Sequence, residues 1–160
     1  MIDLDITELF EEIVKELPEG LEILYPNGKG GTKVMKSPRL NYIFGSSQYI
    51  KDILDEYSKS SAQSERKFPL VALFTPISED RGDADYFSKA KVSLIIACSS
   101  CKEWSNEMRR TTSFKNILRP IYKRLLEVLY EDSRFDCDYD EKVKHIHMAD
   151  AEPIQIPVRL

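Results

Sequence analysis

The sequence predicts an α+β fold in which an antiparallel sheet with a long projecting hairpin packs against two or three helices. Residues 4–17 place apolar side chains at helical spacing, and residues 114–129 carry a second helical stripe suited to covering a sheet face. Between them, residues 68–76 form an apolar run flanked by prolines, and residues 86–98 alternate apolar and polar side chains. These two runs predict the strands of the hairpin.

The composition is that of one ordinary globular domain. The chain has 160 residues, of which 42% are hydrophobic and 31% charged, so we expect a single domain over residues 1–160. A formal net charge of −4 argues against bulk affinity for nucleic acid, and no sequence-specific nucleic-acid partner is expected. The apolar runs are too short to cross a bilayer and the chain starts acidic, so we expect no membrane partner and folding in the cytoplasm.

The N-terminal part predicts a helix followed by short strands. Asp3 or Asp5 can cap the helix, and Pro18-Glu19-Gly20 ends it. Residues 21–25 and a turn-rich segment follow, and two short candidate strands come next at residues 32–36 and 40–44. Together they predict a small β-rich region.

A helical insertion and a polar linker are predicted at about residues 45–67. Ser46 or Ser47 can cap a helix that runs to about Tyr57 with its apolar side chains on one face. The residues that follow, 58–67, are polar and read as a surface loop or linker.

The hairpin is expected to extend beyond the body of the domain. At ~3.3 Å per residue, its return strand would span ~40 Å, which is more than a small core needs. Its tip, residues 77–85, is charged.

The C-terminal third predicts a long helix and two more strands. Pro120 lies inside the helical stripe and cannot donate its backbone N–H, so the helix should kink there or restart with Pro120 in its first turn. Candidate strands follow at residues 142–148 and 154–158, and Pro157 would make the second one an edge strand.

One set of residues raises the alternative of a metal-binding protein or an enzyme of unknown reaction. Cys98 and Cys101 have C-x-x-C spacing, and Cys137, His145 and His147 could complete a tetrahedral site. The C-x-x-C ends a strand rather than opening a helix, so ordinary free thiols are the preferred interpretation. Residues 136–147 and 28–33 lack the order of a calcium loop and a phosphate loop. We therefore expect no cofactor, no metal and no catalytic residue.

Charged residues of the hairpin have two interpretations. The acids of the tip, Glu79 and Asp80 among them, form either a solvated loop or a protein contact, with no base or nucleophile placed beside them. Lys89 and Lys91, on one face of the return strand, are likewise either a solvated face or a subunit-contact stripe.

The order of these features resembles the tail terminator (tail-completion) proteins of long-tailed bacteriophages. The similarity covers roughly residues 68–130. It consists of the strand opening Phe68-Pro69-Leu70-Val71-Ala72-Leu73, the charged tip, the long return strand, and the helix that holds Ile117-Leu118-Arg119-Pro120-Ile121-Tyr122. The segment from about residue 44 to 67 departs from the compact family pattern.

The resemblance implies a structural virion protein without catalytic activity. Its subunits would form a ring, commonly six-membered, that caps the finished tail tube and presents a docking face to head-tail connector proteins. The expected partners are then copies of the chain itself, the tail tube and the connector, and the expected location is the virion, after assembly in the host cytoplasm. The candidate interface on this view comprises Glu79, Asp80, Arg81, Lys89 and Lys91. A monomeric adaptor domain that binds one host protein is the third hypothesis.

Overall fold

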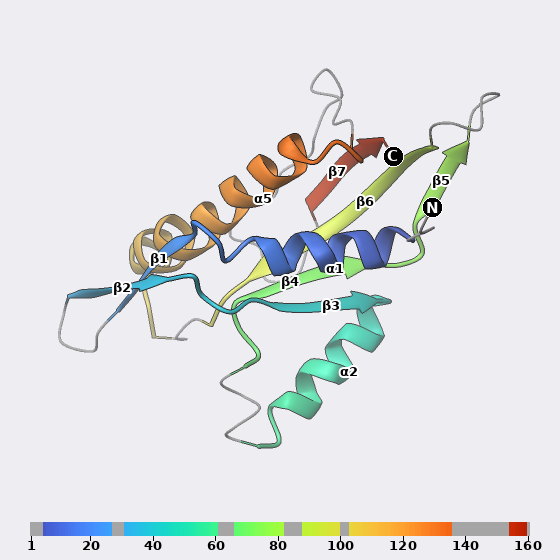
Figure 1. Ribbon diagram of the computed structural model, residues 1–160. Coiled ribbons are helices and arrows are strands. Elements are labelled where there is room, and N and C mark those ends of the chain that lie inside the picture. The colour runs from blue at the N-terminus through green and yellow to red at the C-terminus, as the bar shows by residue number, and fades with distance from the viewer. Residues whose placement is uncertain are drawn as a thin grey trace.

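The computed structural model confirms the α+β class, with two sheets and three helical segments (Figure 1). The structure describes residues 5–26, 31–60, 66–81, 88–99, 103–135 and 154–159; for residues 80, 81, 88, 89 and 154–159 this description covers the backbone alone. Among the described residues, no helix is long and apolar enough to cross a membrane.

Helix α1 (Ile6–Glu16) begins at a capping box. Asp5 Oδ1 accepts hydrogen bonds from the backbone N–H groups of Thr7 (2.8 Å) and Glu8 (3.0 Å), and Glu8 Oε2 accepts one from the Asp5 N–H (3.0 Å). The hydrogen bond from the Thr7 hydroxyl, with those from the backbone, holds the pKa of Asp5 below its ordinary value. Asp5 is thus the cap in use, and Asp3 lies outside the described residues.

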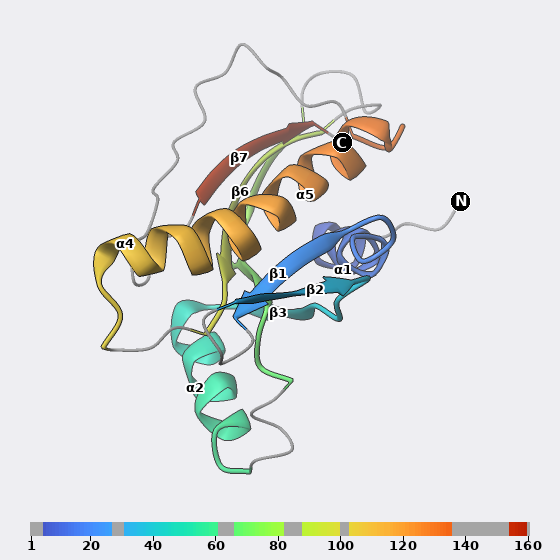
Figure 2. The same ribbon diagram turned by 90° about the vertical axis from the view of Figure 1, so that its left-hand side faces the viewer.

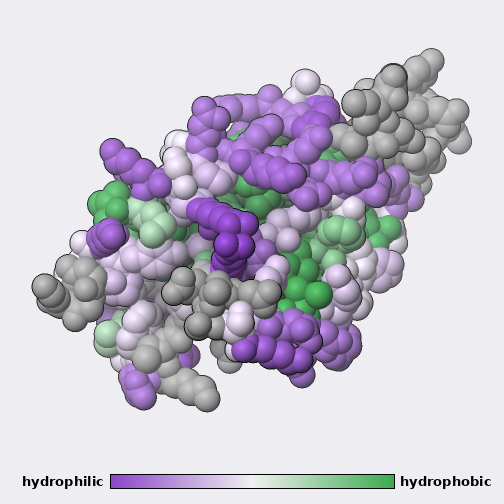
Figure 3. Space-filling model, turned by 60° about the horizontal axis from the view of Figure 1, so that its bottom comes forward, coloured by the Kyte–Doolittle hydropathy of each residue, from purple (hydrophilic) through white to green (hydrophobic). Residues whose placement is uncertain are grey.

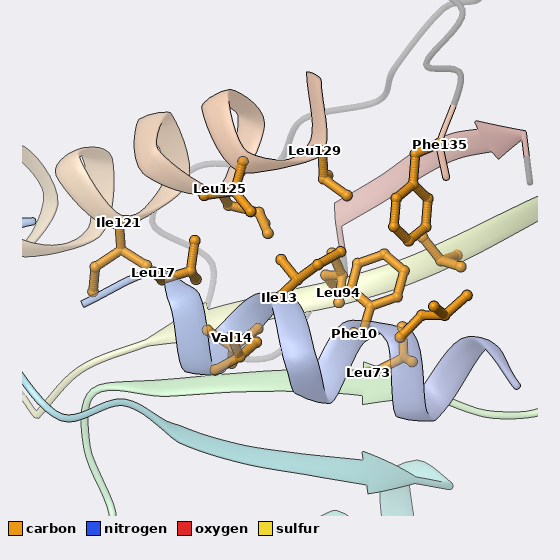
Figure 4. Close-up of a cluster of buried hydrophobic side chains, with 14 of the residues drawn as sticks. Phe10, Ile13, Val14, Leu17, Leu73, Leu94, Ile121, Leu125, Leu129 and Phe135 are labelled. Carbon is orange, nitrogen blue, oxygen red and sulfur yellow. The ribbon is translucent and has the colours of Figure 1, made fainter. Parts of the chain in front are cut away.

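The larger core lies between two helices and one face of the main sheet (Figure 4). Helix α1 supplies apolar side chains at every turn, and they meet those of the C-terminal helix α5 (Arg119–Glu131) and of two strands, β4 (Leu70–Phe74) and β6 (Ser88–Ala97). The fully buried side chains include Phe10, Ile13, Leu17, Leu73, Leu94, Ile121, Leu125 and Leu129.

The main sheet is organised around β6. Its other described strands are β3 (Asn41–Gly45), β5 (Ser78–Arg81) and β7 (Ile154–Arg159). Ala90 of β6 pairs with Glu79 of β5 and with Val158 of β7, and Leu94 pairs with β4 and with β7. Therefore β4 and β5 lie along one edge of β6, and β7 lies along the other.

One pair in this sheet is parallel, so the sheet is mixed rather than wholly antiparallel. Strand β3 runs parallel to β4, with Ile43 opposite Ala72. A parallel pair needs a crossover connection, and helix α2 (Ser47–Tyr57), capped by Ser46, lies in it. The segment that the sequence marks as a helical insertion is this crossover.

Helix α2 covers the second face of the sheet (Figure 2). It packs Ile50 against Leu70 and Ala72 of β4, whereas Val71 and Leu73 of the same strand belong to the core under α1. Strand β4 is therefore buried on both faces, as its continuous apolar run predicts.

The second sheet is a two-stranded antiparallel ribbon of β1 (Glu22–Pro26) and β2 (Thr32–Lys36). Strand β1 is attached to the body through Ile23, which is fully buried in the larger core. All residues of β2 are exposed. Of the two candidate strands in the predicted β-rich region, only residues 32–36 lie in this ribbon, whereas residues 41–45 join the main sheet as β3.

The long helix changes its hydrogen-bonding pattern next to Pro120. A short α4 (Asn106–Met108) continues into a π-helical segment, η1 (Arg109–Leu118), and then into α5, which holds Pro120 in its first turn. Since proline cannot donate to a carbonyl in the preceding turn, a restart at this point satisfies the backbone. Of the kink or restart that the sequence predicts, the structure shows Pro120 in the first turn of α5, with the helical backbone continuous through Leu118 and Arg119.

The paired part of the hairpin reaches further toward the tip than the sequence indicates. Residues 78–81, expected in the charged tip, form β5 and pair with residues 88–91 of β6. In Figure 1 this end of the hairpin points away from α2 and from the β1–β2 ribbon. Strand β7 confirms the last predicted strand and pairs with β6 alone among the described strands; the candidate strand at residues 142–148 lies outside the described residues.

An ion-pair network joins the end of α5 to α1. The guanidinium of Arg134 donates to Asp132 Oδ2 (2.7 Å) through Nη2 and to Glu12 Oε2 (2.7 Å) through Nη1. The Asp132 side chain is 13% exposed, and its hydrogen bonds with Arg134 hold its pKa below the ordinary value. The network holds together the two helices whose apolar faces form the core.

Replacing the cap of α1 should destabilise the protein. We expect Asp5→Ala to lower the free energy of unfolding by about 1 kcal/mol, because the N–H groups of the first turn lose their acceptor. Asp5→Asn, which keeps an acceptor oxygen, should retain most of the stability. Urea denaturation followed by circular dichroism measures both, and equal losses in the two variants would contradict a capping role.

The Asp132–Arg134 pair should make stability depend on pH. A carboxyl group with a depressed pKa contributes stability above its unfolded pKa and loses it as pH falls through the folded one. We expect Asp132→Asn to lower the free energy of unfolding by about 1 kcal/mol at pH 7, with the difference from wild type shrinking below about pH 4. Urea titrations at both pH values measure this, with Glu131→Gln as the control; a difference independent of pH would contradict it.

Candidate subunit interface

The structure brings the predicted interface residues together on two adjacent strands. Backbone register places Asp80 opposite Lys89, Glu79 opposite Ala90 and Arg81 opposite Ser88. Lys91 lies one pair further along, opposite Ser78 in β5 and Pro157 in β7. All five candidates therefore lie within four consecutive residue pairs.

The two faces of this part of the sheet differ. Ala90 and Val92 are buried in the larger core, whereas Lys91, between them in the strand, is exposed. Helix α2 packs on Ile95 and Ala97, toward the other end of β6. The exposed Lys91, on the predicted lysine face, therefore lies beyond the part of β6 that packs with α2.

Strand β2 is an exposed edge that the sequence analysis does not identify as a site. Val34 is 52% exposed and Met35 40% exposed, with Lys33 before them and Lys36 after them. Strand β2 pairs with β1 on one side, and no described strand occupies its other edge. Figure 3 shows apolar atoms flanked by hydrophilic ones at the left-hand end of the molecule, where Figure 1 places this ribbon. Lysines beside an apolar pair are typical of an exposed strand edge and are the signal that could have located it.

A second exposed apolar region lies at the end of β3. Phe44 is 46% exposed and stacks at a tilt on Tyr42, with 6.1 Å between the ring centroids. Tyr49, in the first turn of α2, is 52% exposed and lies against Gly45, where an added Cβ would come within 2.6 Å of its ring. The positive φ of Gly45 (147°) and this close contact both favour glycine between the two aromatic residues. Alternation alone does not show that these rings stay exposed.

The Cys98 thiol is in a setting that disfavours the thiolate. Cys98 is half-buried at the end of β6, and this burial raises the pKa of the thiol, although the nearby Ser113 hydroxyl opposes the rise. Ser113 Oγ is itself buried without a hydrogen-bond partner among the described residues. Because electrophiles react with the thiolate, this environment should slow the reaction of Cys98 with them.

The remaining members of the predicted Cys and His set are not placed. Cys101, Cys137, His145 and His147 lie outside the described residues. Within the described ranges, no group of three His, Cys, Asp or Glu side chains is arranged to hold a metal ion.

Comparison with known proteins adds no relative: no family model matches the chain, and no curated protein is significantly similar to it.

The thiol environment predicts that Cys98 reacts slowly with electrophiles. In a Cys101→Ser, Cys137→Ser variant, we expect Cys98 to react with iodoacetamide several-fold more slowly than a free cysteine peptide at pH 7.5, because burial disfavours its thiolate. The reaction rate of Cys98, followed by mass spectrometry at a series of pH values, should increase at a higher pH than the reaction rate of the peptide. Faster reaction than the peptide at pH 7.5 would contradict the buried environment of the thiol.

Proposed function

We propose that this protein is a structural subunit that assembles with copies of itself. The observation that carries the proposal is β2, a strand exposed along its whole length with Val34 and Met35 on it and one edge unpaired among the described strands. Such an edge offers a row of backbone donors and acceptors beside apolar side chains, which is what a neighbouring chain requires for strand addition.

The aromatic residues at the end of β3 and the start of α2, and the charged hairpin, offer further exposed surfaces. Phe44 and Tyr49 offer large apolar area that interfaces favour, and Lys91 with the paired strands around it offers charge. These features lie on separate elements. Contacts with more than one neighbour, as in a closed ring, use such a distribution.

The specific form that we propose is a ring-forming tail terminator or head-tail junction subunit of a long-tailed bacteriophage. Support comes from the resemblance in the order of the helix, the Phe68-Pro69 strand, the hairpin and the proline-containing helix. The ring would cap the tail tube and contact connector proteins in the virion, after assembly in the host cytoplasm. No catalytic step enters this function.

The proposal predicts a discrete oligomer in solution. Light scattering of the purified protein across a concentration series, followed by negative-stain imaging of the largest species, should reveal a ring-like assembly. Val34→Asn with Met35→Asn should shift assembly to higher concentration by about tenfold or more, because the apolar part of the edge is lost.

The matched control is Met108→Asn, which alters an apolar side chain of similar exposure (47%) on α4. It should leave the concentration dependence unchanged. A strict monomer at every concentration would contradict self-assembly and favour the adaptor hypothesis.

A further inference from the structure

We infer that neighbouring subunits associate head to tail, with the outer edge of β2 on one copy pairing with the outer edge of β5 on the next. This inference rests on the proposed self-assembly and assigns its interface. Both edges are unpaired among the described strands, because β2 pairs with β1 and β5 pairs with β6.

The charges of the two strands are complementary. Strand β2 reads Thr-Lys-Val-Met-Lys and carries two positive charges, whereas β5 reads Ser-Glu-Asp-Arg and has a net negative charge. Two copies of β2 would bring lysines against lysines, which disfavours a symmetric contact between identical edges. An acidic strand removes that repulsion.

The other edge strands fit less well as partners for β2. Strand β3, Asn-Tyr-Ile-Phe-Gly, has no charged residue. Strand β7 contains Pro157, which cannot donate a ladder hydrogen bond, and Arg159, which adds positive charge. Among the edge strands of the main sheet, β3, β5 and β7, only β5 therefore combines an available edge with the opposite charge.

The positions of β2 and β5 suit a ring. Figure 1 shows them at opposite ends of the molecule. Figure 2 looks onto the left-hand end of Figure 1, and there the ribbon that contains β2 lies toward the viewer. An interface between two different surfaces of one chain is heterologous, and repeated rotation about it gives a closed ring or a filament rather than a two-fold dimer.

Charge reversal tests the pairing. Lys33→Glu with Lys36→Glu makes both edges acidic, and Glu79→Lys with Asp80→Lys makes both basic. We expect each double variant alone to raise the concentration for half-assembly by at least about tenfold, and the chain with all four substitutions to recover most of the loss. Analytical ultracentrifugation in 150 mM salt measures this.

Mixing the two double variants gives a sharper outcome. Head-to-tail pairing predicts that the acidic and the basic chain assemble together in equal amounts, because each β2 edge then meets an oppositely charged β5 edge. A symmetric β2-to-β2 contact predicts instead that the acidic variant assembles alone as well as wild type, and that result would overturn the inference.

Controls separate folding from association. Lys36 Nζ lies 3.9 Å from Glu22 Oε1, so replacing Lys36 also removes an ion pair within the ribbon. Lys33→Glu alone therefore serves as the milder variant. Circular dichroism verifies that each chain is folded. Lys51→Glu on α2 with Lys59→Glu just beyond its C-terminal end makes the same change in net charge as Lys33→Glu with Lys36→Glu, away from both edges, and should not affect assembly. A wild-type oligomer insensitive to every reversal would overturn the strand pairing and leave the proposed function standing. A wild-type monomer would overturn both.

Discussion

Helix α1 fills the space between α5 and the main sheet, and the rest of the fold depends on that packing. Phe10, Ile13 and Leu17 are fully buried, and each contributes roughly 1.5–3 kcal/mol through removal of apolar surface from water. The capping box at Asp5 fixes where the helix begins, and Arg134 connects the end of α5 to Glu12 on α1. Together these interactions fix the two helices over one face of β4 and β6, which leaves the opposite face to α2.

The two cores bury both faces of the main sheet around β4, so that other chains could contact the strand edges rather than these faces. Strand β4 contributes to both cores, with Val71 on one side and Ala72 on the other, so no further layer can be added there. By contrast β2, in the separate ribbon, is exposed throughout, and Phe44 stays half-exposed on the edge strand β3. Large apolar side chains at strand edges are costly for an isolated chain and useful for one that assembles.

Charge then distinguishes one edge from another. On the proposed head-to-tail pairing, the lysines of β2 oppose contact between identical edges, whereas the acids of β5 attract them. Specificity would then come from which strand edges remain open and from the sign of the charge along them.

The sequence by itself determined most of the elements and their buried faces, because helical and strand periodicity are local properties. The apolar positions of α1 and the two-faced burial of β4 followed from spacing, whereas a serine cap for α2 and the place of Pro120 in a first turn followed from residue type. Alternation also located Lys91 on the exposed face of β6. The tertiary structure alone decided that β3 lies parallel to β4, that residues 78–81 pair as β5, and that β2 keeps a free edge among the described strands. Strand pairing joins residues far apart in the chain, so no local pattern specifies which edges the finished sheet leaves open.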